Sequence, residues 1–362
     1  MRRYGAIHPF GARADDGWTY RGIDTVVVEN EWLRAVILAG KGGDVFSLVF
    51  KPTDTEFLWR TPNGVTDPRS RAPTTGDGDS LWLDGYEGGW QSVFPNGGDP
   101  SRLGGAGLGL HAESSLLPWD CSISADGPDL AEVTLRVRLQ RTPITAHRTI
   151  GLQAASPVLR VRETLLNTGT EPLPISYGQH ITFGAPFLSE HCRIDLPGGV
   201  VRTHPVSWSP GNRLAPGARA PWPEGPLQDG TCARLDRIPA PGAGIEDQAY
   251  IDDLRDGWYA VTSSRLGVGL AVRYPREIFR HLWYWQVFNG PFRYPWWGRT
   301  YNIGLEPFTS ATNRGIEAAI QDASALMLEP AQPLVCELHL AAFRSQAGVA
   351  GVDPEGHVHT RD

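Results

Sequence analysis

The sequence lacks the features that would hold it in a membrane or against nucleic acid. It contains no stretch of about 18 apolar residues, and its first residues include two arginines but no apolar signal segment. The net charge is -7 and no run of basic residues occurs, which argues against contacts to a phosphate backbone. We therefore expect a soluble, cytoplasmic protein with no membrane and no nucleic-acid partner.

Cysteine is also scarce. The four cysteines in 362 residues are widely spaced and form no C-x-x-C pair. His191 and Cys192 are adjacent, but no partner residues lie at metal-ligand spacing from them. We expect free thiols and no bound metal.

Helical periodicity is rare, whereas period-2 alternation recurs between segments rich in Gly, Pro, Asn and Asp. In residues 131–140, Val133, Leu135, Val137 and Leu139 alternate with polar residues, as in a half-buried antiparallel strand. Similar patterns occupy residues 24–40, 157–169, 257–264, 267–275 and 333–343. The prediction is an all-β fold, a large antiparallel β-sandwich.

The same strand pattern runs through most of the chain. We therefore predict one β domain over residues 1–346 and a flexible C-terminal tail over residues 347–362. Pro- and Gly-rich segments at 61–78 and 209–244 are expected to be long surface loops, since strand patterns resume after each. A single short helix is expected near residues 315–326.

Polar residues that interrupt apolar strands are the candidates for chemistry. Glu306 lies in YNIGLEPFTS, residues 301–310, where a buried carboxylate would be costly. Pro307 cannot donate to a sheet, so we expect the strand to end or lie at an edge there, with Glu306 at a rim. His180 and His111 interrupt two other apolar segments. A histidine and a carboxylate that meet in one cleft form an acid/base pair, although either histidine could instead be structural.

Aromatic residues gather in two segments, 281–301 and 84–100. Strand alternation places Trp283 and Trp285 on one face of the first segment. In the second segment, Trp90 lies close to the amides of Gln91 and Asn96. Flat rings beside amides suit a small-molecule carbohydrate, whose C–H faces stack on rings while its hydroxyls bind side chains. The same rings could equally fill a core.

Four segments in this order resemble the aldose 1-epimerase (galactose mutarotase-like) superfamily, especially its branch with hexose-6-phosphate epimerase-like proteins. They are GGWQSVFPNGG at 88–98, HAESSLLPW at 111–119, YGQHITFG at 177–184 and NIGLEPFTS at 302–310. An acidic loop before a strand, at residues 252–264, adds to the resemblance, which spans about residues 20 to 345. It implies a β-sandwich of twisted antiparallel sheets.

The resemblance also implies roles for single residues. The catalytic histidine corresponds to His180, the catalytic carboxylate to Glu306, and a substrate-binding histidine to His111. Glu306 would take the proton of the anomeric hydroxyl while protonated His180 gives one to the ring oxygen, without a metal or organic cofactor. By analogy with the acidic loop, Asp252 or Asp253 would bind a sugar hydroxyl, and we name Asp253, although both could be surface turn residues.

Two positions depart from the phosphosugar branch. Arginines that grip a phosphate there are replaced by Glu87 and Ser115. Because a carboxylate would repel a phosphate, we expect an aldose 1-epimerase-like mutarotase that acts on an unphosphorylated sugar or sugar derivative, although Arg102, Arg293 or Arg299 could form another anion site. The alternatives are a non-catalytic carbohydrate-binding or regulatory module, or another sugar isomerisation or elimination in the same cleft. The sequence does not distinguish a monomer from a homodimer.

Overall fold

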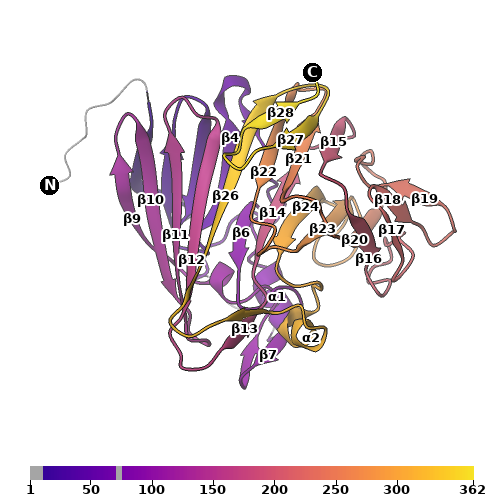
Figure 1. Cartoon of the computed structure of the whole chain (residues 1–362), viewed down its shortest axis with the longest axis horizontal. Helices are drawn as coiled ribbons and strands as arrows, with labels where there is room; N and C mark the ends of the chain where they lie inside the picture. Colours follow the sequence, from indigo (N-terminus) through magenta and orange to yellow (C-terminus); the bar gives the residue numbers. More distant parts are fainter. Residues whose placement is uncertain (1–10, 71–75) are drawn as a thin grey trace.

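Two antiparallel sheets make up most of the structure, which is a computed structural model that describes residues 11–70 and 76–362. Figure 1 shows the strands of the two sheets side by side in one large β-structure. The predicted all-β antiparallel sandwich is confirmed. Residues 1–10, which the sequence placed in the same domain, lie outside the described residues.

The first sheet has twelve strands. In spatial order they are β1 (Arg13–Tyr20), β2 (Ile23–Glu29), β3 (Leu33–Leu38), β4 (Asp44–Phe50), β6 (Trp90–Val93), β14 (Gly178–Gly184), β24 (Tyr301–Phe308), β23 (His281–Phe288), β20 (Ile245–Asp252), β16 (Val200–Thr203) and β17 (Arg219–Pro221), with β5 (Thr55–Glu56) paired to β4.

The second sheet has eight strands. Their order is β15 (Cys192–Asp195), β21 (Trp258–Ser263), β22 (Val268–Arg273), β26 (Pro333–Arg344), β12 (Val158–Asn167), β11 (Ile144–Gln153), β10 (Leu130–Arg138) and β9 (Asp120–Asp126). The predicted alternation holds in β10, where Val133, Leu135 and Val137 are buried and Arg136 and Arg138 are exposed.

Short pairs and helices complete the described part of the chain. The pairs are β7 (Ser101–Leu103) with β8 (Ala106–Leu108), β13 (Leu173–Ile175) with β25 (Leu326–Leu328), β18 (Glu224–Pro226) with β19 (Cys232–Arg234), and β27 (Val349–Val352) with β28 (Val358–Thr360). The helices are α1 (Gly78–Leu83) and α2 (Gly315–Gln321), and the 3-10 turns are η1 (Lys51–Thr53) and η2 (Ser114–Leu116). Neither α1 nor α2, the α-helices of the described residues, is long enough to span a membrane.

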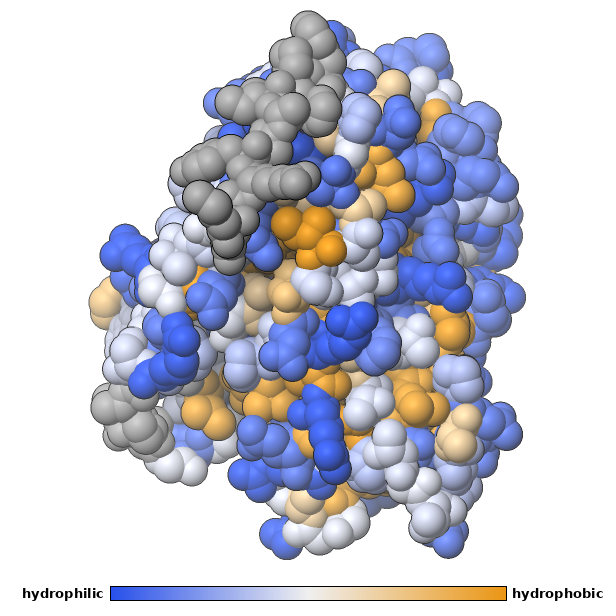
Figure 2. Space-filling model, turned by 90° about the vertical axis from the view of Figure 1, so that its left-hand side faces the viewer, coloured by the Kyte–Doolittle hydropathy of each residue, from blue (hydrophilic) through white to orange (hydrophobic). Residues whose placement is uncertain are grey.

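The core lies between the two sheets and is mainly aliphatic and aromatic. It also contains a charged pair, because Arg148 of β11 and Glu163 of β12 lie opposite each other with their side chains fully buried. Their Nε and Oε1 atoms are 3.0 Å apart. Figure 2 shows the side of the molecule that lies at the left of Figure 1, where hydrophilic residues cover most of the described surface.

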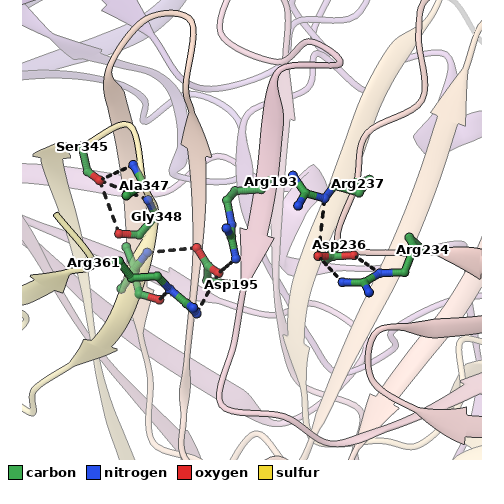
Figure 3. A network of polar contacts seen from close by, with 10 residues as sticks. Arg193, Asp195, Arg234, Asp236, Arg237, Ser345, Ala347, Gly348 and Arg361 are labelled. Atoms are coloured by element: carbon green, nitrogen blue, oxygen red, sulfur yellow. Dashed lines mark hydrogen bonds and ion pairs between the residues drawn. The ribbon is translucent and has the colours of Figure 1, made fainter.

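The prediction of a flexible tail over residues 347–362 is wrong, because this segment forms the β27–β28 hairpin. Val349 and Val352 of the hairpin are buried against Trp258 of the second sheet. Asp195 of β15 accepts hydrogen bonds from the Val349 amide at 2.9 Å and from the Arg361 guanidinium at 3.2 Å (Figure 3). These contacts join the end of the chain to the sandwich.

The two predicted loops differ. The segment at 209–244 is partly ordered into β17, β18 and β19, although it remains peripheral, whereas residues 71–75 of the loop at 61–78 lie outside the described residues. The predicted helix is confirmed as α2, which ends at Gln321.

Candidate active site

His180 and Glu306 lie opposite each other on neighbouring strands. The β14–β24 ladder pairs Gly178 with Phe308 and Thr182 with Gly304, and this register places His180 across from Glu306. The Nε2 atom of His180 is 3.4 Å from Oε1 of Glu306. The tertiary structure therefore brings together two groups separated by more than a hundred residues in sequence.

The expected position of Glu306 at a rim or edge is wrong. Strand β24 lies between β14 and β23 in the middle of the sheet, and it continues to Phe308. The β14–β24 ladder has no pairs between Gly178–Phe308 and Thr182–Gly304, so it is already open beside Pro307, where a hydrogen-bond donor is missing. Glu306 is consequently only 2% exposed.

A row of side chains that includes four predicted site residues crosses this sheet. His180 pairs with Gln91 of β6, and on the other side Glu306 pairs with Trp283 of β23, which pairs with Tyr250 of β20. Residues opposite each other in antiparallel strands point to the same face. The acid/base pair thus has a tryptophan as its neighbour on the face that points away from the other sheet.

This face forms one wall of a cavity of about 690 Å³. Five predicted site residues line it: His111, His180, Trp283, Trp285 and Glu306. Among the residues that line it and that sequence analysis did not select are Trp82, His204, Trp208, Glu246, Gln248, Arg293, Trp296 and Arg314. Most of these come from loops and from α1, where no strand alternation marks their direction.

Trp90 and Asn96, which were predicted to bind substrate, do not line the cavity. The Trp90 ring is fully buried beneath the Arg148 guanidinium, 4.6 Å away, and its Nε1–H donates to Gln179 at 2.7 Å. The Asn96 amide donates to the carbonyls of Asp99 and Gly109 at 3.0 and 2.8 Å. Both residues hold the structure around the cavity rather than facing it.

Gln91 and Asp253 are also absent from the cavity lining. Gln91 points to the cavity side but lies beneath Trp82, whose Nε1–H donates to Gln91 Oε1 at 3.2 Å. Asp253 is an exposed turn residue, and its neighbour Asp252 is bound to Arg202 and His281. The acidic loop therefore supplies an ion-pair network and no side chain to the cavity wall.

Glu87 does not face the cavity either, which removes the argument that it would repel a phosphate there. Its Oε2 atom is 2.6 Å from the Lys41 ammonium, and Lys41 also contacts Asp44 at 3.0 Å. All three side chains are buried. Burial raises the pKa of Glu87 to about 8 despite its contact with Lys41. Ser115, at the other altered position, is buried and donates to the His111 carbonyl at 2.8 Å.

Aromatic rings surround the two cavity histidines. The Trp82 ring stacks on Tyr86, with centroids 4.1 Å apart, and lies 4.7 Å from the His111 ring. His111 and His180 have ring centroids 5.0 Å apart. Trp82 belongs to α1, which sequence analysis missed because six residues are too few for a helical period. The N-cap of α1 was a usable signal, since Asp77 accepts a hydrogen bond from the Ser80 amide at 2.7 Å.

Hydrogen bonds fix the orientation of His180. The Tyr86 hydroxyl donates to Thr182 Oγ1 at 3.4 Å, and the Thr182 hydroxyl donates to the Gly89 carbonyl at 2.7 Å. The Tyr86 oxygen also lies 3.2 Å from Nδ1 of His180. Because the Tyr86 proton is already given to Thr182, the Tyr86 oxygen must accept this second hydrogen bond. This assignment places a proton on Nδ1 and leaves Nε2 as an acceptor toward Glu306.

Burial sets the protonation of the pair. It lowers the pKa of His180 to about 3 and raises the pKa of Glu306 well above its usual range. The favoured form of the empty site is therefore neutral, with one proton on the Glu306 carboxyl group and an acceptor at His180 Nε2. Moving that proton across 3.4 Å produces the ion pair. Burial, and then the neighbouring His180, also hold the pKa of His111 well below its usual range.

The glycine two residues before Glu306 makes room for the carboxyl group. A Cβ atom at Gly304 would lie 2.3 Å from Oε1 of Glu306. The glycine in the opposite strand has a similar role, because a Cβ at Gly178 would lie 2.2 Å from the Phe308 ring. Any larger side chain at residue 304 would push the carboxyl group out of its present position.

A second hollow, of about 740 Å³, lies beside the network of Figure 3 and contains none of the predicted site residues. Arginine and aspartate side chains from β15, the β19 region and the C-terminal hairpin line it, and they include Arg193, Asp195, Arg234 and Asp236. These residues are already paired, since Asp195 contacts Arg193 at 2.6 Å and Asp236 contacts Arg234 at 2.9 Å. The acid/base pair is confined to the first cavity.

A family model described as a domain of unknown function, DUF4432, matches residues 20–342. The chain belongs to this family. Among curated proteins, no relative matches this DUF4432 sequence.

Solved structures share the fold. A candidate aldose 1-epimerase from Klebsiella pneumoniae has a TM-score of 0.68 and 14% identity, with 93% of this chain and 84% of that chain covered. A candidate aldose 1-epimerase from Escherichia coli K12 has a TM-score of 0.59 and 15% identity, covering 89% and 100%. A galactose mutarotase-like protein from Lactobacillus casei has a TM-score of 0.55 and 17% identity, covering 88% and 100%. The DUF4432 chain thus has the galactose mutarotase-like fold that its sequence motifs resemble.

Proposed function

We propose that this protein is a mutarotase that equilibrates the anomers of an unphosphorylated aldose or aldose derivative. The observation that carries the proposal is the His180–Glu306 contact of 3.4 Å in a cavity lined by tryptophan rings. The pair supplies one proton acceptor and one proton donor within hydrogen-bond reach of a single small molecule. The shared fold is consistent with this chemistry but does not establish it.

The proposed reaction is a balanced transfer of two protons. Sugar hydroxyls that hydrogen-bond to Glu306 favour the ion-pair form, in which His180 Nε2 carries the shared proton. Glu306 then takes the proton of the anomeric hydroxyl, His180 gives its proton to the ring oxygen, and the bond from C1 to the ring oxygen breaks. After rotation about C1–C2, the ring closes on the other face of the carbonyl and both protons return.

The other cavity residues have binding roles in this proposal. Trp285, which is half-buried, offers its ring to a ligand, whereas the Trp283 ring lines the wall beside Glu306 with one face stacked on Phe308. His111 lies where its ring can donate to a sugar hydroxyl. The Gly98 amide donates to Nδ1 of His111 at 3.2 Å, so the proton of the neutral ring lies on Nε2. The site thus offers both apolar faces and polar partners, as carbohydrate recognition requires.

The acidic lining of the cavity supports an unphosphorylated substrate independently of Glu87, which does not face the cavity. Apart from Glu306, which carries a proton, its lining contains four carboxylate residues, Asp77, Asp79, Asp99 and Glu246, and two arginines, Arg293 and Arg314. A phosphate dianion would enter a region with an excess of acidic groups. Neutral hydroxyls, in contrast, find both donors and acceptors there.

Anomer exchange measured by NMR tests the proposal directly. Wild-type protein, added to a panel of pure α or β aldoses, should bring at least one of them to equilibrium faster than buffer does. Glu306→Gln should remove this acceleration while retaining binding. If the wild type accelerates no sugar but binds one by calorimetry, a carbohydrate-binding role is favoured; if the products differ chemically from the substrate, another sugar reaction is favoured.

A further inference from the structure

The cavity continues well beyond the acid/base pair, along strands β20 and β23. Tyr250 pairs with Trp283 in the row that contains Glu306, whereas Glu246 pairs with Val287 four residues further along. At about 3.3 Å per residue, these two rows are about 13 Å apart. Both ends belong to the same cavity, since Trp283 and Glu246 line it. This length exceeds that of one pyranose ring.

The far end has polar groups of its own. Glu246 is 4% exposed, and its Oε2 accepts a hydrogen bond from the Arg293 guanidinium at 2.9 Å and another from the Ser209 hydroxyl. The buried Nε atom of Arg293 has no hydrogen-bond partner among the described residues. The adjacent Trp208 lines the cavity, and its buried Nε1 atom also has no partner in the described part of the chain. This end of the cavity therefore combines a buried Glu246–Arg293 ion pair with the indole ring of Trp208, the residue that precedes Ser209.

The chemistry of this end fits a neutral sugar ring. Arg293 and Glu246 neutralise each other, so they attract no net charge, but together they offer donors and acceptors to hydroxyl groups. The Trp208 ring supplies an apolar face, and the His204 ring, 6.4 Å from it, continues the lining toward Tyr250. Midway between the two ends, Trp285 pairs with Gln248, and both residues line the cavity.

We propose that Trp208, Glu246 and Arg293 form a second sugar subsite, and that the substrate is a reducing disaccharide or longer oligosaccharide whose reducing end lies at His180 and Glu306. This inference rests on the proposed function, because it assigns the reducing ring to the acid/base pair. It adds that affinity for the substrate comes in large part from a ring that undergoes no chemistry.

The test compares glucose with reducing disaccharides that end in glucose, namely maltose, cellobiose and lactose, and galactose with a galactobiose. Anomer exchange of each is measured by NMR for the wild type, for Trp208→Ala, and for Trp18→Ala as a control. Trp18 is a suitable control because it is 59% exposed on β1, away from the cavity lining. At least one disaccharide should have a kcat/KM about tenfold above that of its free hexose, as expected for one well-packed ring contact.

Trp208→Ala should remove this advantage and leave the hexose rate unchanged, whereas Trp18→Ala should change neither. The proposal is overturned if no disaccharide exceeds its hexose, or if Trp208→Ala lowers both equally. If the wild type exchanges no sugar at all, the proposed function fails, and calorimetry with the same sugars decides the subsite separately. Tighter binding of a disaccharide that is lost in Trp208→Ala still supports the subsite, and equal binding of hexose and disaccharide overturns it.

Discussion

Two buried carboxylates, Glu163 of β12 and Glu306 of β24, contact opposite faces of β14 and have very different surroundings. Between the sheets, Oε2 of Glu163 accepts hydrogen bonds from Ser92 and Gln179 at 3.0 and 2.7 Å and another from the Tyr177 hydroxyl, while Oε1 lies 3.0 Å from Nε of Arg148 in an ion pair. On the cavity face, Glu306 contacts one polar partner within the described residues, His180 at 3.4 Å. The same strand therefore separates an acid with four polar partners from an acid with one.

This difference distinguishes a structural group from a reactive one. Three hydrogen bonds and the ion pair with Arg148 compensate the buried charge of Glu163, and the bond from Gln179 ties β14 to the second sheet. Glu306 has no such compensation, so burial raises its pKa and its proton remains available for exchange. A carboxylate with unused hydrogen-bonding capacity in a cavity is the one that a ligand can still engage.

The largest expected effect concerns the reactive acid. Glu306→Gln should lower kcat for anomer exchange by about 10²- to 10⁴-fold, because the amide cannot take the proton of the anomeric hydroxyl. Its free energy of unfolding should change by less than about 1 kcal/mol, since a neutral amide replaces a buried, neutral carboxyl group of similar shape. NMR exchange and urea unfolding measure the two quantities.

For Glu163, the structural acid, we expect the opposite result: loss of its partner lowers stability and has little effect on activity. Arg148→Met leaves Glu163 buried without its cation and should lower the free energy of unfolding by about 3–5 kcal/mol. The double variant Arg148→Met/Glu163→Gln should recover part of this loss, and the activity per folded molecule should stay within a few-fold of wild type. A double variant as unstable as Arg148→Met alone would contradict this assignment.

A smaller change displaces the reactive acid without removing it. Gly304→Ala places a methyl group where Oε1 of Glu306 now lies, so the carboxyl group must turn away from His180. We expect kcat to fall by about tenfold or more, since a misplaced base loses much of its contribution. Gly151→Ala, in a strand of the second sheet where the nearest atom is 3.4 Å from the added Cβ, is the matched control and should be active.

We expect Tyr86 to be a positioning residue for His180, the partner of the reactive acid Glu306. Tyr86→Phe removes the acceptor of the Nδ1–H of His180 and should lower kcat by up to about tenfold while KM stays within twofold. The loss should be accompanied by a changed pH profile, because the tautomer of His180 is no longer fixed. An unchanged profile with a lower unfolding midpoint would indicate a purely structural role.

The smallest expected effect is the response of the wild type to mild acid. The pKa of His180 is lowered to about 3 by burial and that of Glu306 is raised, so the pair retains one proton throughout the range between them. Between about pH 5 and the raised pKa of Glu306, kcat/KM should therefore vary by less than about twofold. Activity should fall near pH 3, where a second proton is taken up, and again above the raised pKa of Glu306, where this group loses its proton. A sigmoidal rise centred near pH 6.5 would show that His180 titrates normally.

Much of the fold could be predicted because alternation reports directly on a half-buried strand. The strands β10, β12, β21, β22 and β26 occur where the pattern indicated. The candidate site was only partly predictable. The motifs singled out His180, Glu306 and His111, but they also included Trp90, whose ring points between the sheets, and Gln91, which lies beneath Trp82.

The sequence by itself determined the antiparallel strands, the scarcity of helix and the presence of one unusual carboxylate in an apolar strand. The tertiary structure decided what surrounds that carboxylate, because the strand register places Glu306 opposite His180 and next to Trp283. It also decided that Glu87 pairs with Lys41 instead of facing a ligand, and that residues 347–362 form a hairpin. Alternation defines which residues share a face of one strand, but only pairing and sheet stacking decide what that face meets.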